Sequence, residues 1–434
     1  MNEDWSSRRL HFVGIGGAGM SGLALVAQAL GAQVTGSDRA DSPYAERLRE
    51  HGIEPIIGHA AGNVPPGAEV VYSTAVPADN PERAAAEGRE LHRADLLAEI
   101  TRLRRCIAVT GTHGKTTTAA MIVHALAGCG LDPSYLVGAE LSTGTNAGWG
   151  SGDWVVVEAD ESDRSLLKLD PEIAVLTNAE LDHHATYASM HDLEATLAEF
   201  MGRAEHAIVW DRPALRALCP PGFVTYDAPS PVLDTRGARF LWRGIEVALA
   251  VPGAHNATNA AGALEAAAVA GADPVAAAAA LADFHAARRR FERVGETVTG
   301  AVVYDDYAHH PTEVAATLAA ARTLEPGRVV AVFQPHLYSR TRALASAFGV
   351  ALAAADAVVV VGIYPARERA ADFPGVSGRL VAAAAADVGN GSRVAWIPDL
   401  ADAERYLRST LRTGDLCLTM GAGDIDSLAR ALIG

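Results

Sequence analysis

Thr-Gly-Thr-His-Gly-Lys-Thr-Thr-Thr, at residues 110–118, is the stretch that decides the fold of this chain. The apolar residues 106–109 before it predict a short buried strand. The apolar residues 119–127 after it predict a helix that ends at Gly128 and Gly130. A strand, a glycine loop with Lys-Thr and a helix form the layout of a phosphate-binding loop. The stretch therefore predicts phosphate binding.

The residue types of this loop explain the chemistry. Gly111 and Gly114 let backbone N–H groups approach phosphate oxygens, and the helix start adds further donors and the positive end of a dipole. Lys115 supplies a cation for the β and γ phosphates, and the Thr116 hydroxyl is able to hold Mg²⁺. The full spacing of this motif would need glycine at Val109. The alternative is therefore a glycine turn with a chance Gly-Lys-Thr.

Composition limits the class of protein. A length of 434 residues predicts roughly three domains. A net charge of −16 without a basic tract argues against nucleic-acid binding. The four cysteines form no CxxC pair, which suits a reducing cytosol. The N-terminus does not resemble a signal peptide, and the Ala-rich runs are too short to span a membrane. We expect a cytoplasmic protein.

A second glycine-rich stretch lies near the N-terminus. Residues 10–13 predict a strand, residues 14–22 read Gly-Ile-Gly-Gly-Ala-Gly-Met-Ser-Gly, and residues 23–30 predict a helix. A further strand leads to Asp38, so the Gly-x-Gly-x-x-Gly pattern is followed by an acid about 20 residues on. Alone, this pattern predicts NAD(P) binding. It requires only a diphosphate at a helix N-terminus, however, so another nucleotide or a plain strand–helix turn stays open.

Acidic and histidine residues follow two predicted strands after the phosphate loop. Residues 154–157 form an apolar run that leads directly into Glu158 and the acidic stretch 159–163, where Mg²⁺ is usually held beside a phosphate loop. A solvated acidic loop fits less well, because Glu158 follows that apolar run. Residues 173–177 predict a strand that leads to His183 and His184. With no Cys or HExxH motif beside them, these histidines indicate a second Mg²⁺-like ion or a structural role rather than zinc.

The last third of the chain alternates predicted strands and helices. Strands at 301–304, 329–333, 357–361, 394–397 and 416–420 predict another doubly wound sheet. Polar loops at 305–312, 334–341 and 421–424 lie at the carboxyl ends of strands, where open sheets bind ligands. Before this region, Asn259 falls on the first turns of an Ala-rich helix. The run 288–290 contains three arginines that form either a solvated face or a triphosphate contact.

Taken together, these motifs resemble the Mur ligase family, and within it the branch that adds L-alanine to UDP-N-acetylmuramate. The matching segments follow the family order: residues 14–22, 111–118, 158–163, 177–183, 253–260, 289–292, 305–313, 333–341 and 420–425. The family's phosphate loop also lacks the first glycine of the full motif. Its N-terminal glycine loop holds the UDP of the substrate, so the resemblance replaces the NAD(P) interpretation.

The resemblance implies an α/β fold of three domains. Residues 1–105 would form a Rossmann-like domain for the UDP substrate, residues 106–293 a central ATP-binding sheet, and residues 294–434 a C-terminal Rossmann-like domain for the amino acid. The implied reaction converts UDP-N-acetylmuramate, L-alanine and ATP, with Mg²⁺, into UDP-N-acetylmuramoyl-L-alanine, ADP and phosphate through an acyl phosphate, in peptidoglycan precursor synthesis. The implied partners are these small molecules, with no nucleic acid or membrane, and the chain would be a monomer or homodimer.

The resemblance also assigns roles residue by residue. ATP would contact Gly111, Thr112, His113, Gly114, Lys115, Thr116, Thr117, Asn259 and Arg290. Metal would be held by Thr116, Glu158 and His183. The substrates would contact Gly17, Ala18, Gly19, Met20, Ser21, Asp38, Ser73, Thr145, Asn146, Ser162, Tyr307, His336 and Arg340. The catalytic set would be Lys115, Glu158, His183, His309 and Arg340, with His309 as the acceptor of the alanine amine proton.

Two positions depart from the family pattern. Ala185 stands where the family often has Asp, and Leu337 stands where it often has Arg. We expect Arg340 to carry alone the charge recognition that two arginines usually share. Two alternatives remain: a ligase that joins a tripeptide to UDP-N-acetylmuramate, whose branch tends to have Tyr at the Ser162 position, and an NAD-dependent oxidoreductase. The oxidoreductase would leave Lys115 and Glu158 unexplained.

Overall fold

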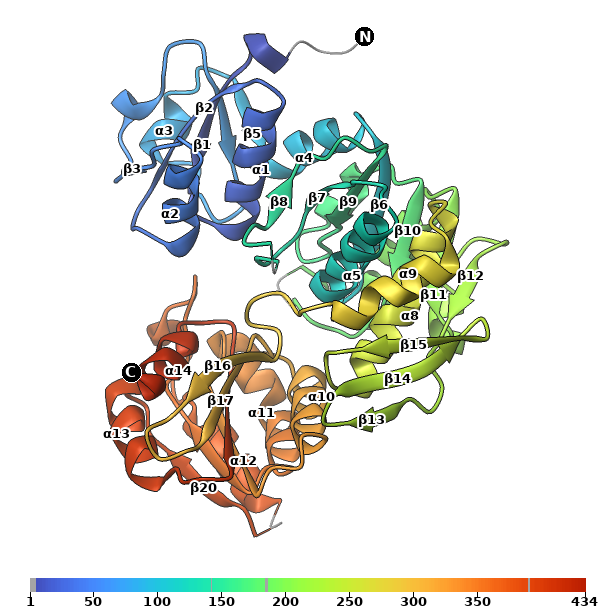
Figure 1. Cartoon of the computed structure of the whole chain (residues 1–434). Coiled ribbons are helices and arrows are strands. Elements are labelled where there is room, and N and C mark those ends of the chain that lie inside the picture. The colour runs from blue at the N-terminus through green and yellow to red at the C-terminus, as the bar shows by residue number, and fades with distance from the viewer. Residues whose placement is uncertain (1–4, 142, 184–185, 389–390) are drawn as a thin grey trace. The chain divides into compact units, whose positions relative to one another are not determined.

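The computed structural model describes residues 5–141, 143–183, 186–388 and 391–434, and it divides the chain into two compact units (Figure 1). Unit 1 comprises Met1–Ala228, Trp242–Val247 and Thr258–Phe284, and unit 2 comprises Pro229–Leu241, Ala248–Ala257 and His285–Gly434. Unit 1 contains two largely parallel sheets and unit 2 contains one, so the doubly wound α/β class predicted from the motifs is confirmed.

The first sheet is fully parallel, in the order β3-β2-β1-β4-β5. Its strands are β1 (Arg9–Val13), β2 (Gln33–Asp38), β3 (Ile56–Ile57), β4 (Glu69–Tyr72) and β5 (Glu90–His92). The connecting helices are η1 (Trp5–Ser7), α1 (Ala18–Ala29), α2 (Pro43–Glu50), η2 (Ala61–Asn63), α3 (Pro81–Ala84) and α4 (Arg93–Thr101). Strand β1 is central, so the glycine turn after it opens at the middle of the carboxyl edge, where open α/β sheets bind ligands.

The second sheet holds the phosphate loop. Its order is β12-β11-β10-β6-β9-β7-β8, and only the β7–β8 pair is antiparallel. The strands are β6 (Arg105–Thr110), β7 (Ser134–Leu136), β8 (Ala147–Gly148), β9 (Trp154–Glu158), β10 (Ile173–Leu176), β11 (His206–Trp210) and β12 (Val224–Tyr226). The three middle strands are apolar and buried because helices cover both faces of a parallel sheet.

Strand β6 lies between β9 and β10, which carry the predicted acidic and histidine loops. The carboxyl ends of these three strands therefore meet at one edge. The helices around this sheet are α5 (Lys115–Gly128), η3 (Ser165–Lys168), α6 (Met190–Met201), α7 (Pro213–Arg216), α8 (Ala254–Val269), α9 (Pro274–Ala280) and η4 (Leu281–Asp283).

The third sheet, in unit 2, has the order β16-β17-β21-β18-β19-β20. Its strands are β16 (Glu292–Glu296), β17 (Val302–Asp306), β18 (Arg328–Phe333), β19 (Ala357–Val360), β20 (Arg393–Trp396) and β21 (Asp415–Met420). Its helices are α10 (Pro311–Arg322), α11 (Tyr338–Leu352), η5 (Ala370–Asp372), α12 (Arg379–Asp387), α13 (Leu400–Thr410) and α14 (Ile425–Ile433). The five predicted strands are present to within about two residues at each end.

Several strands were not predicted, and two cases are informative. Strand β16 adds an antiparallel edge to the third sheet through its pairing with β17. A separate small sheet contains β13 (Val232–Asp234), β14 (Gly237–Trp242) and β15 (Ile245–Leu249). In β14 and β15 buried and exposed residues alternate, as in a sheet with one covered face, whereas the predictions relied on continuous apolar runs.

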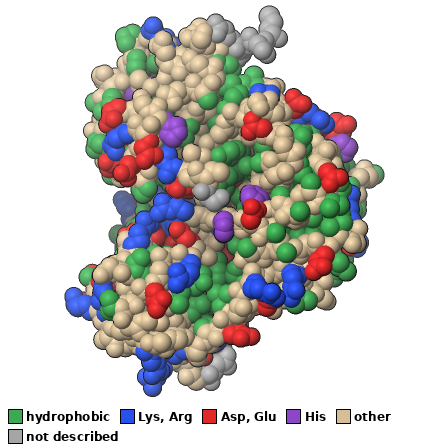
Figure 2. Space-filling model, viewed as in Figure 1, with side chains coloured by type: hydrophobic (Ala, Val, Ile, Leu, Met, Phe, Trp, Pro, Cys, Tyr) green, Lys and Arg blue, Asp and Glu red, His purple; other side chains and the backbone are tan. Residues whose placement is uncertain are grey.

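The surface carries both signs of charge. Acidic and basic side chains are interspersed over the face shown in Figure 2. Within the described residues, no helix is both long and apolar enough to cross a membrane.

A buried carboxylate, Glu82, ties the first sheet to its loops. Ser37 donates a hydrogen bond of 2.5 Å and Asn63 one of 2.6 Å to its two oxygens. The rings of His11 and His59 lie 3.6 and 3.3 Å from its Oε2 atom. Burial alone would raise the pKa of this carboxyl group, but these partners outweigh it and lower the pKa of Glu82 from its usual 4.5 to about 2.

We expect Glu82→Gln to destabilise the protein at pH 7 by roughly 2–3 kcal/mol, because a buried charged hydrogen-bond acceptor is lost. The folded pKa of Glu82 is lower than its usual 4.5, so the stabilisation is fully present above pH 4.5 and is lost as the pH falls toward 2. Thermal melting of both proteins between pH 7 and pH 3.5 should show a difference in Tm that narrows below pH 4.5. A difference that stays constant over this range would contradict the role of the charge.

Candidate active site

Steric constraints shape the phosphate loop between β6 and α5. Gly111 has φ +124° and Gly114 has φ +80°, conformations that other residues rarely adopt. A Cβ atom at Gly111 would lie 2.7 Å from the backbone oxygen of Asn178, and one at Gly114 would lie 2.7 Å from Oδ1 of Asn259. Both backbone angles favour glycine, and at Gly111 the backbone of Asn178 also leaves no space for a side chain. Asn259, on the second turn of α8, lies beside the loop.

The loop is bonded to the turn that follows β10. The Thr112 hydroxyl donates to the Glu180 carbonyl oxygen and accepts from the Glu180 N–H group, both at 2.9 Å. The N–H group of His113 donates to Oδ1 of Asn178, and its carbonyl oxygen accepts from the Thr177 hydroxyl at 2.6 Å. These two turns are thereby fixed to each other, which holds the backbone of the loop in a defined shape.

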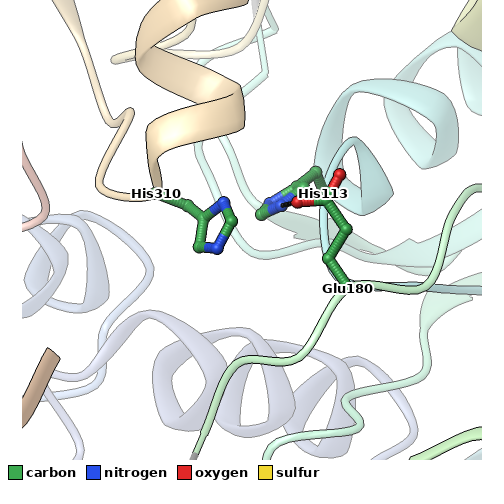
Figure 3. Close-up of side chains that lie close together, drawn as sticks. All are labelled: His113, Glu180 and His310. Atoms are coloured by element: carbon green, nitrogen blue, oxygen red, sulfur yellow. Dashed lines mark ion pairs between the residues drawn. The ribbon is translucent and has the colours of Figure 1, made fainter. Parts of the chain in front are cut away.

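The side chains of His113 and Glu180 add an ion pair to this connection. Nε2 of His113 lies 3.5 Å from Oε2 of Glu180, as the dashed line in Figure 3 marks. His310, also labelled in Figure 3, is the N-cap of helix α10 and belongs to unit 2.

Lys115 is surrounded by acceptors. Its Nζ atom donates to the carbonyl oxygens of Gly111 at 2.6 Å and Thr112 at 3.3 Å, and to Oε2 of Glu161 at 2.8 Å. Burial by itself would lower the pKa of Lys115, but the nearby carboxylates, Glu161 first, outweigh burial and raise it. Lys115 is therefore positively charged, and three acceptors hold its ammonium group beside the loop.

Thr116 and Glu158 provide oxygen atoms suited to Mg²⁺. The Thr116 hydroxyl donates to Oε2 of Glu158 at 3.1 Å, and the N–H group of Gly138 donates to Oε1. A hydroxyl and a carboxylate in contact beside a phosphate loop fit the hard oxygen ligands that Mg²⁺ prefers. His183 has φ +53°, and its Nε2 atom lies 3.4 Å from Oε1 of Glu161. Ala185 and His184 lie outside the described residues.

The other acidic residues of the stretch 158–163 contact a different cation. Asp160 and Asp163 lie 3.2 and 3.4 Å from Nη2 of Arg93, at the start of α4. Asp160 also accepts the N–H group of Ser162 at 2.9 Å. The charges of the acidic loop thus have separate partners. Glu158 lies beside Thr116 and Glu161 beside Lys115, and the two aspartates lie beside Arg93 of helix α4.

The N-terminal glycine turn is held open at the start of α1. Gly17 is the N-cap of this helix, and a glycine has no side chain to cover the first N–H groups. Oδ2 of Asp38 accepts the N–H group of Gly16 at 2.9 Å, which fixes the turn. Nη1 of Arg93 lies 3.8 Å from the place that a Cβ atom on Gly19 would take. A basic side chain and a helix N-terminus therefore meet where a diphosphate was predicted.

The remaining predicted substrate residues of unit 1 lie around this turn or on the acidic loop. Nδ2 of Asn146 donates to the carbonyl oxygen of Ala18 at 2.6 Å, and the Thr145 hydroxyl bonds the Tyr135 hydroxyl at 2.8 Å. Met20 and Ser21 are buried, and the N–H group of Ser21 donates to the carbonyl oxygen of Gly17 at 2.9 Å. Ser73 directly follows β4 and is half-buried.

In unit 2, one arginine of the run 288–290 is structural. The Arg289 guanidinium bonds Oδ2 of Asp305 at 2.9 Å and the carbonyl oxygens of Gly423 and Gly421 at 2.9 and 2.7 Å. It thereby joins the ends of β17 and β21. The Arg290 guanidinium lies 5.2 Å from the centre of the Tyr307 ring, a cation–π contact.

His309 is oriented by its neighbours. Its Nδ1 atom lies 2.9 Å from the carbonyl oxygen of Tyr307 and 3.3 Å from Oε2 of Glu313. A carbonyl oxygen only accepts, so Nδ1 carries the proton and the lone pair of the neutral ring is on Nε2. Glu313 also takes part in the capping box of α10 with His310.

His336 and Arg340 lie together at the start of α11. Nη1 of Arg340 lies 3.1 Å from Nδ1 of His336, and the His336 ring stacks on Tyr364 with 5.8 Å between centres. Arg340 is buried. Leu337, the N-cap of α11, has φ +68°, a strained angle for leucine.

Several residues of these clusters were not predicted as site residues, among them Glu161, Arg93 and Asp306. Each lies next to a predicted residue in sequence or space, but only the fold reveals its partner. Asp306 accepts the N–H groups of Phe291 and Ala308, and burial raises its pKa to about 6. Glu161 falls within the acidic stretch 159–163, and its position after an apolar strand was a usable signal.

Comparison with known proteins places these features in one family. The model of the Mur ligase family catalytic domain matches residues 9–105, that of the Mur ligase middle domain matches residues 109–267, and that of the Mur ligase glutamate ligase domain matches residues 289–423. The chain belongs to the Mur ligase family.

Individual relatives are more specific. The chain is 44% identical to a UDP-N-acetylmuramate–L-alanine ligase of Rubrobacter xylanophilus, covering 98% of this chain and 99% of the relative, and 46% identical to one of Kineococcus radiotolerans, covering 97% and 94%. Its fold is similar to the crystal structure of UDP-N-acetylmuramate-alanine ligase from Thermotoga maritima, with a TM-score of 0.85 and 27% identity over 98% of each chain. A murein peptide ligase of Psychrobacter arcticus shares the fold, with a TM-score of 0.72 and 24% identity over 98% of each chain.

We expect Lys115→Ala and Glu158→Ala each to reduce kcat by at least ~10²-fold, because each removes a group that meets developing charge. The measurement is phosphate release, with circular dichroism to confirm folding. The chain has only two lysines, so Lys168→Ala is a matched control: Lys168 is an exposed lysine paired with Asp95. Near wild-type turnover in a folded Lys115→Ala or Glu158→Ala protein would show that its role is misassigned.

We expect Arg340→Ala to raise the KM for the anionic uridine substrate by about tenfold or more, with little change in the KM for ATP, because one guanidinium carries most of the recognition. Leu337→Arg in the Arg340→Ala background should restore part of the affinity, since a second fork-shaped donor lies one helical turn away. Kinetics of both single variants and the double variant test this. A change confined to the ATP KM, or no rescue, would contradict it.

Proposed function

We propose that this chain is an ATP-dependent ligase that joins L-alanine to UDP-N-acetylmuramate in peptidoglycan precursor synthesis. The observation that carries this proposal is the identity of 44% to a relative of that name over nearly the full length of both chains. The phosphate loop and the Thr116–Glu158 pair supply the chemistry that such a reaction needs.

The first step would transfer a phosphoryl group to the muramate carboxylate, because a carboxylate is a poor acyl donor. Phosphoryl transfer depends mainly on positioning and charge neutralisation. Gly111, Gly114 and the start of α5 would bind phosphate oxygens, and Lys115 would neutralise charge on the γ phosphate. Mg²⁺ held by Thr116, Glu158 and His183 would neutralise further charge on the triphosphate. Asn259 and Arg290 would contact ATP.

The second step would be attack of the alanine amine on the acyl carbon, with loss of phosphate. The free amine is mostly protonated at pH 7, so a base must accept its proton. We assign this role to His309, whose ring is oriented by the contact of Nδ1 with the carbonyl oxygen of Tyr307. Tyr307, His336 and Arg340 would bind the muramate and the amino acid, and cationic groups would stabilise the tetrahedral oxyanion.

The uridine substrate would bind at the N-terminal turn, through Gly17–Ser21, with Asp38, Ser73, Thr145, Asn146 and Ser162 around it. We also propose a cytoplasmic protein, monomeric or homodimeric, whose domains comprise residues 1–105, 106–293 and 294–434. Strand β16 (Glu292–Glu296) contains the second of these boundaries and pairs with the third sheet.

We expect phosphate release to require ATP, UDP-N-acetylmuramate and an amino acid together, with L-alanine preferred. Single omissions, other amino acids and the tripeptide serve as controls in the same assay. Faster turnover with the tripeptide than with L-alanine would contradict the proposal in favour of the recycling ligase. An absorbance change with NADH and no phosphate release would favour the oxidoreductase.

A further inference from the structure

The side chain of Lys115 has no donor left for a ligand in this structure. An ammonium group has three N–H donors, and three acceptors lie around it: two loop carbonyl oxygens and Glu161. A phosphate oxygen that binds Nζ must therefore displace one of the three. The two carbonyl oxygens belong to the loop that is proposed to bind the phosphate. Glu161 instead lies in the loop that follows strand β9.

Glu161 is the acceptor most in conflict with a phosphate. Its carboxylate is 1% exposed, so its charge is poorly solvated and requires a cation nearby. Oε2 contacts Lys115 at 2.8 Å, while Oε1 makes no hydrogen bond and lies 3.4 Å from Nε2 of His183. A phosphate and this carboxylate would both require the one ammonium charge.

The neighbouring carboxylates have other partners. Glu158 accepts from Thr116 and Gly138, and Asp160 and Asp163 contact Arg93. Glu161 is thus the member of this acidic loop that bonds the phosphate-loop lysine. The second oxygen of Glu161 lies near His183. The Glu161 carboxylate therefore keeps a contact when Lys115 moves away.

We propose that Glu161 is a positioning residue that holds Lys115 across the phosphate loop before nucleotide binds. It then releases Lys115 to the nucleotide phosphate, while its own carboxylate keeps the contact with His183. This inference rests on ATP binding by the loop, as in the proposed function. The contact with Glu161 opposes nucleotide binding, because it must be broken before Lys115 meets the phosphate. The same carboxylate keeps His183 in place for the reaction.

The decisive variant is Glu161→Gln, which keeps the shape of the side chain and removes its charge. Titration calorimetry with ADP should show binding about tenfold tighter than wild type, because a competing charged hydrogen bond is gone. The kcat for ligation should fall, since His183 and Lys115 lose the negative charge of their common neighbour. Structural damage alone would weaken ADP binding, so the direction of the change separates the two explanations.

Two controls make the test specific. Asp163→Asn removes one negative charge from the same loop without touching Lys115, so it should leave the ADP affinity nearly unchanged. In a Lys115→Ala background, Glu161→Gln should no longer tighten ADP binding. Equal tightening in Asp163→Asn, tightening that persists without Lys115, or unchanged or weaker binding in folded Glu161→Gln would each overturn the inference.

A second measurement needs no variant. Crystal structures of the wild-type protein without and with ADP should show the contact between Lys115 Nζ and Glu161 Oε2 intact in the first and broken in the second. Retention of the contact while a phosphate occupies the loop would overturn the inference. Failure of the wild-type protein to bind ADP or ATP would overturn the proposed function itself, and the inference with it.

Discussion

The close approach of the phosphate loop to the turn after β10 is the constraint on which the site in unit 1 depends. No side chain fits at Gly111, because its Cβ atom would meet Thr177 and the backbone of Asn178. That approach allows Thr112 and His113 to form hydrogen bonds with the turn after β10. The chain continues from this turn to His183. Because Gly111 has no side chain, the two turns can contact each other. This contact positions the backbone donors of the phosphate loop, the start of α5 and the first residues of the histidine loop.

Charge distribution is the second organising factor. Four carboxylates within six residues would repel one another if they faced one space, since like charges close together are unfavourable. Their partners instead diverge: a hydroxyl for Glu158, an ammonium for Glu161, and one guanidinium for Asp160 and Asp163. Because Arg93 also lies near the glycine turn of the first sheet, the acidic loop links the two predicted phosphate sites of unit 1 through one side chain.

Much of this arrangement was predictable from local patterns, and the rest was not, for a physical reason. The strand before Gly111 and the helix after Lys115 follow from apolar runs and glycine positions, which act over a few residues. The pairing of Arg93 with Asp160 joins residues 67 positions apart, and no local pattern encodes it. Strand β16 was missed because it is an edge strand with exposed residues, so it carries no apolar run.

The arginine run 288–290 shows how a single pattern divides into different roles. The sequence left open a solvated face or a triphosphate contact for all three residues. Arg289 fits neither description, because its guanidinium is consumed by Asp305 and two loop carbonyl oxygens. Arg289 and Phe291 both have positive φ, at 58° and 54°, which non-glycine residues adopt only when their surroundings hold them there. The bonds of Arg289, together with the N–H group of Phe291 on Asp306, supply that restraint. Arg290 lies between Arg289 and Phe291, which these hydrogen bonds restrain. The backbone conformation of Arg290 is therefore set by its two neighbours, and neither neighbour has to contact a ligand.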